Sequence, residues 1–248
     1  MKISVCMATY NGERFIREQL TSILGQLEAG DEVVIVDDAS SDNTVAIIES
    51  FCDKRTRVLR EARNGGVVKT FGRALEEASG DIIFLSDQDD VWREDKVSKF
   101  KHMFSTCADV SLVLSDSSII DANGDLVAKT RFKLRQFNPG AVHNFVRNSY
   151  MGCSMAFRRR ILDYCLPIPA DIPMHDVWIG ILNQLVSKTG FIDEPLMSYR
   201  RHDNNLSRGK HSPLAQMIRW RWALIKNLTL RYKRAAVFKR GIAANPAQ

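Results

Sequence analysis

The sequence has few cysteines, and their spacing indicates neither a structural zinc site nor a disulfide framework. The chain of 248 residues contains five, an odd number, with no Cys-x-x-Cys pair among them: Cys6, Cys52, Cys107, Cys153 and Cys165. Structural zinc sites and small disulfide-rich folds both need paired cysteines at short spacing. We therefore expect buried free thiols in a reducing compartment, the cytoplasm.

Long apolar runs are also lacking. No stretch approaches the roughly 20 apolar residues of a transmembrane helix. The first residues, Met1 to Cys6, read directly as a strand and not as the apolar segment of a signal peptide. Hydrophobic residues make up 45% and charged residues 26% of the chain, as in ordinary globular proteins. These features favour one large α/β domain, alone or with an appendage.

Acidic residues are missing from the C-terminal part of the chain. From Pro213 onward there are eight Lys or Arg residues and no Asp or Glu, whereas residues 1–212 hold 27 basic and 29 acidic residues and so carry a net charge of −2. The net charge of +6 therefore belongs to the tail. The body has no basic excess that would indicate a nucleic-acid partner.

Apolar strands alternate with helical patterns in the first part of the chain. Strands are expected at 3–8, 32–36, 57–60 and 82–85, with helices at 13–27, 44–51 and 67–78 between them. Asp42 is a plausible N-cap of the second helix. This alternation predicts a parallel, doubly wound sheet, in which ligands bind beyond the carboxyl ends of the strands.

The second half is less regular. We expect helices at 93–105 and 175–186, a strand at 110–115, a strand at 152–157 and short strands at 191–192 and 196–199. Ala122-Asn123-Gly124-Asp125 predicts a hairpin turn between Ile119-Ile120 and Leu126-Val127. The polar stretch 129–138 is expected to be a loop.

Three carboxylates follow the strand at 82–85, at Asp87, Asp89 and Asp90. Carboxylates this close repel one another and raise one another's pKa unless a cation lies between them. An Asp-x-Asp pair at a strand end suits Mg²⁺ or Mn²⁺, which take one or two carboxylates and complete their shell with water and phosphate oxygens. The alternative is a polar turn that caps the next helix through Asp90 or Asp95.

Several motifs occur in one order along residues 3–206, and together they resemble glycosyltransferase family 2, the inverting enzymes with the GT-A fold. The sequence around Asp87 is similar to that of bacterial polysaccharide enzymes, rhamnosyltransferases among them. The family usually has Glu-Asp where this chain has His175-Asp176. The matching motifs are Ala8-Thr9-Tyr10-Asn11, Asp37-Asp38-Ala39-Ser40-Ser41-Asp42, Arg63-Asn64-Gly65-Gly66, Ser86-Asp87-Gln88-Asp89-Asp90-Val91-Trp92, Gly152-Cys153-Ser154, His175-Asp176-Val177-Trp178 and Tyr199-Arg200-Arg201-His202 with Asn205.

The resemblance implies a Rossmann-like, mostly parallel sheet flanked by helices. Residues 1–208 would form the GT-A catalytic domain, with a nucleotide-binding half (1–92) and an acceptor-binding half (93–208), and residues 209–248 a basic helical extension. The implied activity is metal-dependent transfer of a sugar, with inversion, from a UDP- or dTDP-sugar to a hydroxyl of a glycan or lipid-linked acceptor in cell-surface polysaccharide synthesis.

Two other functions stay open. A sugar nucleotidylyltransferase has a similar fold, but it usually carries a Gly-rich basic loop after the first strand, and here that loop is Ala8 to Glu13. A catalytically silent module that binds a nucleotide sugar is the second, and the intact Asp87, Asp89 and Asp176 speak against it.

The resemblance also implies roles for single residues. Asp89 is the expected direct ligand of Mg²⁺ or Mn²⁺, Asp87 shares the ion or faces the ribose, and His202 reaches the same diphosphate or metal unless it is an exposed loop histidine. Asp176 is the expected general base. It lies at a predicted helix start, where the helix N-terminus should keep it ionised, so that its pKa need not be raised. Its alternative role is that of a simple helix-start carboxylate.

The remaining candidates concern the nucleotide. Tyr10 is expected to stack on the base, Asp38 to accept a hydrogen bond from the pyrimidine N–H, and Lys69 either to reach the phosphates or to lie on a solvated helix face. The full set expected around the nucleotide sugar is Thr9, Tyr10, Asn11, Glu13, Asp38, Arg63, Asn64, Lys69 and Asp87.

The tail combines an apolar stripe with a basic row. The apolar residues at helical spacing are Leu214, Met217, Ile218, Trp222, Ile225 and Leu228, and Arg219, Lys226, Lys233 and Arg240 recur every seventh residue. This pattern predicts a basic amphipathic helix at the inner face of an anionic membrane. The alternative is a helix that packs its apolar stripe on the body or on a second subunit.

Overall fold

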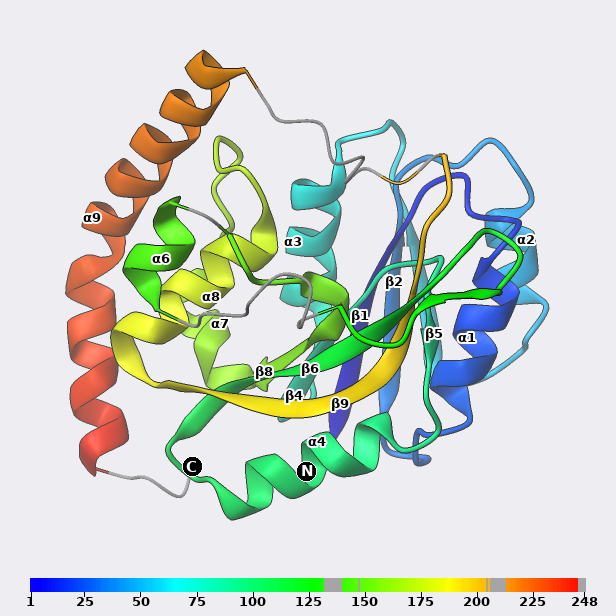
Figure 1. Ribbon diagram of the computed structural model, residues 1–248, viewed down its shortest axis with the longest axis horizontal. Coiled ribbons are helices and arrows are strands. Elements are labelled where there is room, and N and C mark those ends of the chain that lie inside the picture. Colours follow the sequence, from blue (N-terminus) through cyan, green and yellow to red (C-terminus); the bar gives the residue numbers. More distant parts are fainter. Residues whose placement is uncertain (132–139, 147, 204, 206–212, 245–248) are drawn as a thin grey trace.

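The computed structural model describes residues 1–131, 140–146, 148–203, 205 and 213–244. Its centre is a mixed β-sheet flanked by helices (Figure 1). The first half contains β1 (Ile3–Thr9), α1 (Ile16–Leu24), β2 (Glu32–Asp37), α2 (Thr44–Glu49), β3 (Thr56–Arg60), α3 (Val67–Glu77), β4 (Ile82–Ser86), β5 (Val91–Trp92) and α4 (Lys96–Thr106). The second half contains β6 (Val110–Ile120), β7 (Leu126–Ala128), α6 (Ala141–Val146), the 3₁₀ turns η1 (Gly152–Ser154) and η2 (Arg159–Ile161), β8 (Met155–Arg158), α7 (Leu162–Cys165), α8 (His175–Val186), β9 (Lys188–Arg200) and α9 (Leu214–Ala244).

The strands lie in the order β3-β2-β1-β4-β8-β6-β9-β5, and β7 pairs with β6. The first four neighbours are parallel, β8 is antiparallel to both β4 and β6, and β6 and β9 are parallel. In this register Thr9 lies opposite Asp37, Asp37 opposite Arg60, and Met7 opposite Ser86. The loops that follow β1 to β4 therefore meet at one edge of the sheet, where ligands of open α/β sheets bind.

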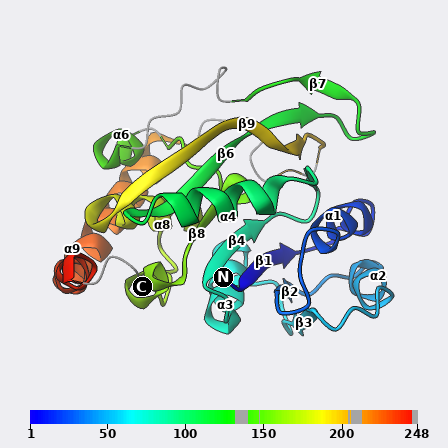
Figure 2. The ribbon, with the colours of Figure 1, turned by 90° about the horizontal axis from the view of Figure 1, so that it is seen from below.

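Helices cover both faces of this sheet. Apolar residues of α1, α2 and α4 pack on one face, around Ile16, Ile48 and Phe100. Residues of α3 and α8, including Phe71 and Trp178, pack on the other. Figure 2 shows α3 and the pair α1 and α2 on opposite sides of β1. The central strands β1, β2 and β4 are buried almost throughout, which explains their continuous apolar sequence.

The α/β fold with alternating elements is confirmed, and most element boundaries move by a few residues. The helix expected at 13–27 is shorter, at Ile16–Leu24. The strand expected at 152–157 begins only at Met155, because residues 152–154 form η1. The two short strands expected at 191–199 are one strand, β9, whose register with β6 shifts between Ser115 and Asp116 and between Asp116 and Ser118. The hairpin joins β6 and β7 as expected.

Three smaller expectations need correction. Asn43, not Asp42, occupies the N-cap position of α2, although the carboxylate of Asp42 accepts a hydrogen bond from the N–H of Thr44 at 3.0 Å. Cys52 is exposed and Cys107 is half-buried, so not all the thiols are buried. Most of the stretch 129–138 lies outside the described residues.

The C-terminal helix α9 runs along α7 and α8 (Figure 1). Leu224 is buried in the same apolar cluster as Trp178. Among the helices of the described residues, none is long and apolar enough to cross a membrane.

Candidate active site

A cluster of carboxylates lies in the loop that connects β4 to β5. Asp87 is half-buried, while Asp89 and Asp90 are buried. Burial, and then the charges of Asp89 and Asp176, raise the pKa of Asp87 to about 7. Burial, and then the charges of Asp89 and Asp87, raise the pKa of Asp90 well above its ordinary value. The carboxylates thus repel one another as the sequence predicts.

The end of the chain's last strand reaches over this cluster. Nε2 of His202 lies 2.7 Å from Oδ2 of Asp89, and the side-chain amide of Asn205 donates to the same oxygen at 3.2 Å. The imidazole stacks on Phe15, with 4.7 Å between ring centroids. His202 is therefore not an exposed loop histidine. Two of the three residues expected to hold a metal, Asp89 and His202, are in contact.

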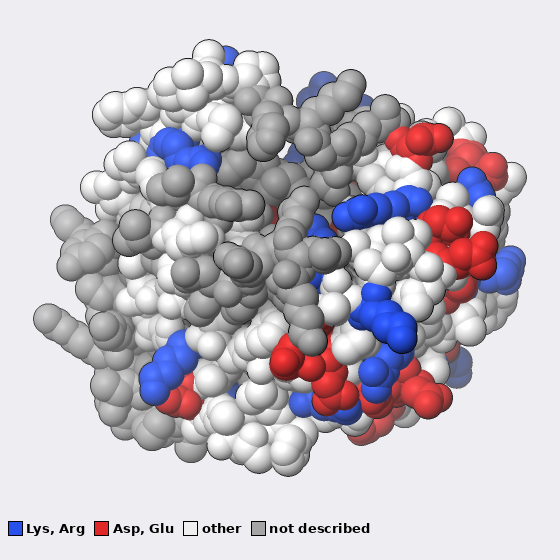
Figure 3. Space-filling model, viewed as in Figure 1, with Lys and Arg blue, Asp and Glu red and all other residues white. Residues whose placement is uncertain are grey.

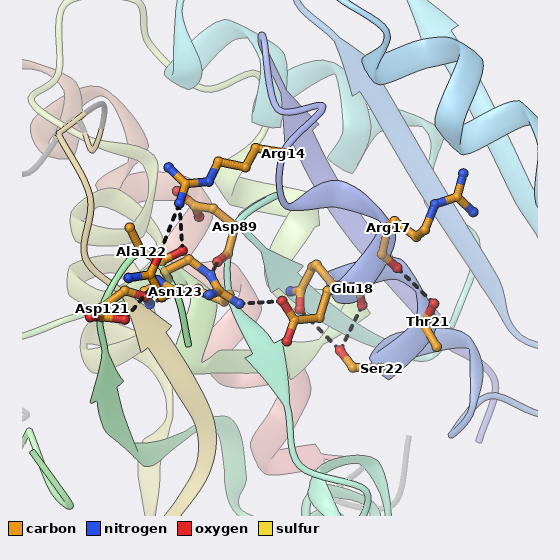
Figure 4. A network of polar contacts seen from close by, with 12 residues as sticks. Arg14, Arg17, Glu18, Thr21, Ser22, Asp89, Asp121, Ala122 and Asn123 are labelled. Atoms are coloured by element: carbon orange, nitrogen blue, oxygen red, sulfur yellow. Dashed lines mark hydrogen bonds and ion pairs between the residues drawn. The ribbon is translucent and has the colours of Figure 1, made fainter. Parts of the chain in front are cut away.

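Arg200 belongs to a motif named in the sequence analysis, but it was given no role there. Its side chain is buried, and its Nε donates to the carbonyl oxygen of Asp89 at 2.8 Å while its Nη2 pairs with Glu18 at 2.5 Å. Its backbone N–H donates to Oδ1 of Asp90 at 3.0 Å. Figure 4 shows Asp89, Glu18 and Asp121 around this network. A buried arginine so placed fixes the acidic loop against α1.

This network corrects the alternative role of Asp90 as a helix cap. The N-cap position of α4, which starts at Lys96, is occupied by Asp95 and not by Asp90. Asp95 makes no side-chain cap there and pairs with Arg93 and Lys99 instead. Among the described residues, no hydrogen-bond partner reaches the buried Oδ2 of Asp90. An orphaned carboxylate oxygen of this kind is costly unless a cation or water reaches it.

The donor set of the cluster fits a hard divalent cation. Ligand atoms of Asp87, Asp90 and Cys153 all lie within 4.8 Å of one another. Burial raises the pKa of the Cys153 thiol, so it stays protonated and is a poor ligand, whereas carboxylate oxygens suit Mg²⁺ and Mn²⁺. Behind them lies the fully buried Lys96, whose Nζ donates to the carbonyl oxygen of Cys153 at 2.8 Å. Lys96 is a second candidate functional residue that the sequence analysis did not identify, because its sequence context is that of an ordinary surface lysine on a helix.

Asp176 lies in the first turn of α8 and is buried. Its Oδ1 accepts a hydrogen bond from the N–H of Val177 at 2.6 Å and its Oδ2 one from Gly152 at 3.1 Å. Burial nevertheless raises its pKa to about 6. The expectation that the helix start would leave this pKa low is therefore wrong, because desolvation outweighs the two hydrogen bonds. The charge of Asp176 contributes to the raised pKa of Asp87, so the two carboxylates lie near each other.

His175 replaces the usual glutamate beside the candidate base. Its ring stacks on Phe71 with 3.9 Å between centroids, and neither ring nitrogen has a hydrogen-bond partner among the described residues. Burial lowers its pKa to about 3, so the imidazole is neutral at physiological pH. A Cβ added to Gly152 would approach Nε2 of His175 to 3.1 Å and Cβ of Asp176 to 3.6 Å. Gly152 thus lets the base and its neighbour lie directly against the chain.

The loops that follow β1 and β2 hold each other in place. Thr9 is buried and its hydroxyl donates to Asp37 at 2.8 Å, so it links the ends of β1 and β2. Oδ1 of Asn11 accepts from the N–H of Ser41 at 2.8 Å, and the carboxylate of Glu13 accepts from the backbone and side chain of Asn43 at 3.0 and 2.8 Å. These three predicted nucleotide residues support the loops with their side chains.

Tyr10 is different, because its side chain is exposed at the rim. Its backbone N–H and C=O are both bonded to the side-chain amide of Gln88, at 2.9 and 3.0 Å. Gln88 lies between the acidic residues of the β4–β5 loop, so this pair joins the first strand-end loop to the carboxylate cluster.

Asp38 holds the loop after β3. Its two oxygens accept hydrogen bonds from the N–H groups of Gly65 at 2.7 Å and Gly66 at 2.9 Å. Gly66 has φ +85°, a conformation that suits glycine. Arg63 and Asn64 are exposed in the same loop.

Lys69 does not point to the acidic cluster. Its Nζ pairs with Glu61 at 2.8 Å. It lines a cleft of about 500 Å³ between α3 and Pro167 to Ala170, and Asp87, Asp89, Asp90 and Asp176 are not among the residues that line this cleft. The structure therefore favours its alternative location on the solvated side of α3.

Comparisons with curated proteins agree with these observations. The chain is 29% identical over 223 residues to a dTDP-rhamnosyl transferase of Shigella flexneri, covering 80% of this chain and 72% of the relative. It is 28% identical over 223 residues to a UDP-Glc:alpha-D-GlcNAc-diphosphoundecaprenol beta-1,3-glucosyltransferase of Escherichia coli, covering 86% and 82%. It also spans 66% of the length of a glycosyltransferase of Nostoc sp., at 27% identity over 83% of this chain.

Solved structures show the same fold. The TarS fragment 1–349 of Staphylococcus aureus, in complex with UDP-GlcNAc, matches with a TM-score of 0.71 and 21% identity over 96% of this chain and 71% of that chain. A mannosyltransferase of Pyrobaculum calidifontis in complex with GDP-Man and Mn²⁺ matches with a TM-score of 0.61 and 18% identity, covering 98% and 75%. The fold is thus the GT-A type. The model of the family "Glycosyl transferase family 2" matches residues 4–166, and the chain therefore belongs to this family of enzymes, which transfer sugars from nucleotide-sugar donors.

Proposed function

We propose that the protein is a metal-dependent, inverting glycosyltransferase that uses a UDP- or dTDP-sugar and an acceptor hydroxyl. The observation that supports this most directly is the position of Asp176, a buried carboxylate with a pKa of about 6 that lies near the acidic loop. A base with such a pKa is ionised at neutral pH and still able to take a proton.

The step follows from this arrangement. The acceptor oxygen forms a bond to the anomeric carbon while the bond between that carbon and the diphosphate oxygen breaks with its electron pair. Asp176 takes the hydroxyl proton, and the nucleoside diphosphate leaves. Because attack and departure occur on opposite faces of the carbon in one displacement, the anomeric configuration inverts.

The leaving diphosphate gains negative charge next to carboxylates, so a cation is needed there. We propose that Asp89, Asp87 and His202 hold Mg²⁺ or Mn²⁺ at this edge. The bound ion would act as a Lewis acid on the diphosphate. Arg200 keeps the acidic loop against α1, and Tyr10 and the Asp38-held glycine loop border the nucleotide.

The names of the relatives support a choice of substrates. They include a dTDP-rhamnosyl transferase and a glucosyltransferase that acts on a diphosphoundecaprenol-linked sugar. We infer that this protein acts in cell-surface polysaccharide synthesis, on a glycan or lipid-linked acceptor at the cytoplasmic face of a membrane.

Metal dependence gives the first test. Incubation with UDP-glucose, UDP-GlcNAc or dTDP-rhamnose and Mn²⁺ should release the nucleoside diphosphate slowly even without an acceptor, and excess EDTA should stop this. Asp89→Asn should remove Mn²⁺-dependent donor binding in calorimetry, whereas Asp125→Asn, at the exposed β6–β7 hairpin, should leave it unchanged. Full release in EDTA would rule out the metal part of the proposal.

The same assay separates the two other functions. A nucleotidylyltransferase would form a nucleotide sugar and pyrophosphate from a nucleoside triphosphate and a sugar 1-phosphate. A silent module would bind the nucleotide sugar and release nothing. Either result would replace the proposed function.

A further inference from the structure

The helix α9 has an inward face that fixes its orientation. Leu224 is buried, and Met217 and Leu228 on the same side are half-buried. The guanidinium of Arg231 donates to the carbonyl oxygens of Tyr164 at 2.9 Å, Leu166 and Pro167 at 2.7 Å. These contacts hold the helix against the end of α7. They fix the orientation of the helix about its axis and therefore the direction of its other face.

That other face is apolar and exposed. Leu214, Ile218, Trp222 and Ile225, spaced by four, four and three residues, share one side of the helix. Their exposed fractions are 73%, 50%, 67% and 44%. The stripe predicted from the sequence therefore divides in two, because Met217 and Leu228 turn inward. In Figure 3 the start of α9, at the upper left, is largely white with isolated blue side chains.

Positive charge accompanies this face. Arg219 and Lys226 are exposed and seven residues apart, which places them together on the helix beside Trp222. Nζ of Lys226 forms an exposed ion pair with Oδ2 of Asp171 at 3.5 Å. From Pro213 onward the sequence contains eight basic residues and no acidic one. Pairing of two such helices from two copies would bring like charges together, whereas an anionic surface complements them.

We propose that the face of α9 formed by Leu214, Ile218, Trp222, Ile225, Arg219 and Lys226 is a binding surface for an anionic phospholipid bilayer. The helix lies in the plane of the interface, with the indole and aliphatic side chains at the acyl boundary and the basic groups among the headgroups. This inference rests on the proposed function, because a lipid-linked acceptor would be presented at that surface.

The test uses the full chain and vesicles of phosphatidylcholine with or without phosphatidylglycerol. At low salt the wild-type protein should co-sediment with the anionic vesicles, and much less with the neutral ones or at high salt. The double variant Ile218→Gln/Trp222→Gln should weaken binding about tenfold or more, because the bilayer then no longer buries two apolar side chains. Arg219→Gln/Lys226→Gln should weaken binding to anionic vesicles only.

A matched control comes from the β6–β7 hairpin. Leu126 and Val127 are each 58% exposed but lie away from α9, so Leu126→Gln/Val127→Gln should bind vesicles like the wild type. Circular dichroism and the melting temperature should show that all three variants are folded. Absence of wild-type binding at low salt, or equal loss in the hairpin control, would overturn the proposal. Self-association without vesicle binding would identify a second copy as the occupant instead.

Donor hydrolysis distinguishes this failure from a failure of the proposed function. It needs no membrane, so the α9 variants should hydrolyse the donor at the wild-type rate. Hydrolysis without vesicle binding would refute the membrane-binding role of α9 but not the proposed glycosyltransferase activity. Vesicle binding without hydrolysis by any variant would refute the activity and leave the surface.

Discussion

At the scale of single residues, Asp176 shows burial overriding local structure. Its position in the first turn of a helix and its two backbone hydrogen bonds both favour the ionised carboxylate, yet desolvation raises its pKa from 3.8 to about 6. The sequence could predict the residue and its helix. It could not predict the pKa, because the residues that cover Asp176, such as Gly152, come from another part of the chain.

This pKa predicts the acidic limb of the pH profile. The base works only when ionised, and at saturating metal the cation should keep Asp87 ionised although burial raises its pKa to about 7. The ratio kcat/KM for transfer should therefore be constant at neutral pH and fall about tenfold per pH unit as the pH drops below about 6. His175, with a pKa near 3, adds no second step in this range. Initial rates at saturating metal and low donor concentration measure the profile. A limb centred near pH 4 would mean that Asp176 is not desolvated in solution.

Replacement of the base tests its role directly. Asp176→Asn keeps the size of the side chain but cannot accept the proton, so turnover should fall about a hundredfold or more while donor affinity stays within a few-fold. The control is Asp163→Asn, an exposed aspartate in the first turn of α7, which should behave as wild type. Turnover of Asp176→Asn near the wild-type rate would place the base elsewhere.

Inversion is a separate consequence of having one base and one displacement. The anomeric coupling constant of the product, measured by NMR, should correspond to the configuration opposite to that of the donor. A product with the donor's configuration would require a second nucleophile or another mechanism, whatever the effect of Asp176→Asn.

At the scale of elements, the end of β9 supports the acidic loop of β4. The backbone N–H of Arg200 bonds to Asp90, and β9 pairs with β5 just beyond that aspartate. Sequence patterns predicted both segments separately. They could not predict that these segments meet, because about a hundred residues and several strands lie between them.

Arg200→Lys should expose this support. Lysine keeps the charge but loses the planar fork that contacts the carbonyl of Asp89 and the carboxylate of Glu18, so unfolding free energy should fall by about 2 kcal/mol and Mn²⁺ affinity about tenfold. Urea unfolding and calorimetric titration measure the two effects. Arg201→Lys, one residue away and exposed, is the control. Equal behaviour of the two variants would contradict the role given to Arg200.

At the scale of the whole molecule, the fold was the most predictable level. Polar motifs follow several predicted strands in a fixed order, and a parallel sheet is the arrangement that brings such strand ends together. In the structure the loops after β1 to β4 do lie at one edge of the sheet. The division into residues 1–208 and 209–248 stays a prediction. The direction in which α9 presents its side chains could not be predicted, because a helix with apolar residues on two sides can bury either one.

The bonds from Arg231 to the carbonyls at the end of α7 have a consequence for acceptor choice. They make α9 a rigid spacer between Asp176 and any surface that its outward face contacts. If that surface is a bilayer, the base stands at a constant height above the lipid headgroups. An acceptor hydroxyl must then project to that height, so the number of sugars between lipid and hydroxyl would select the substrate by length, independently of which sugars they are.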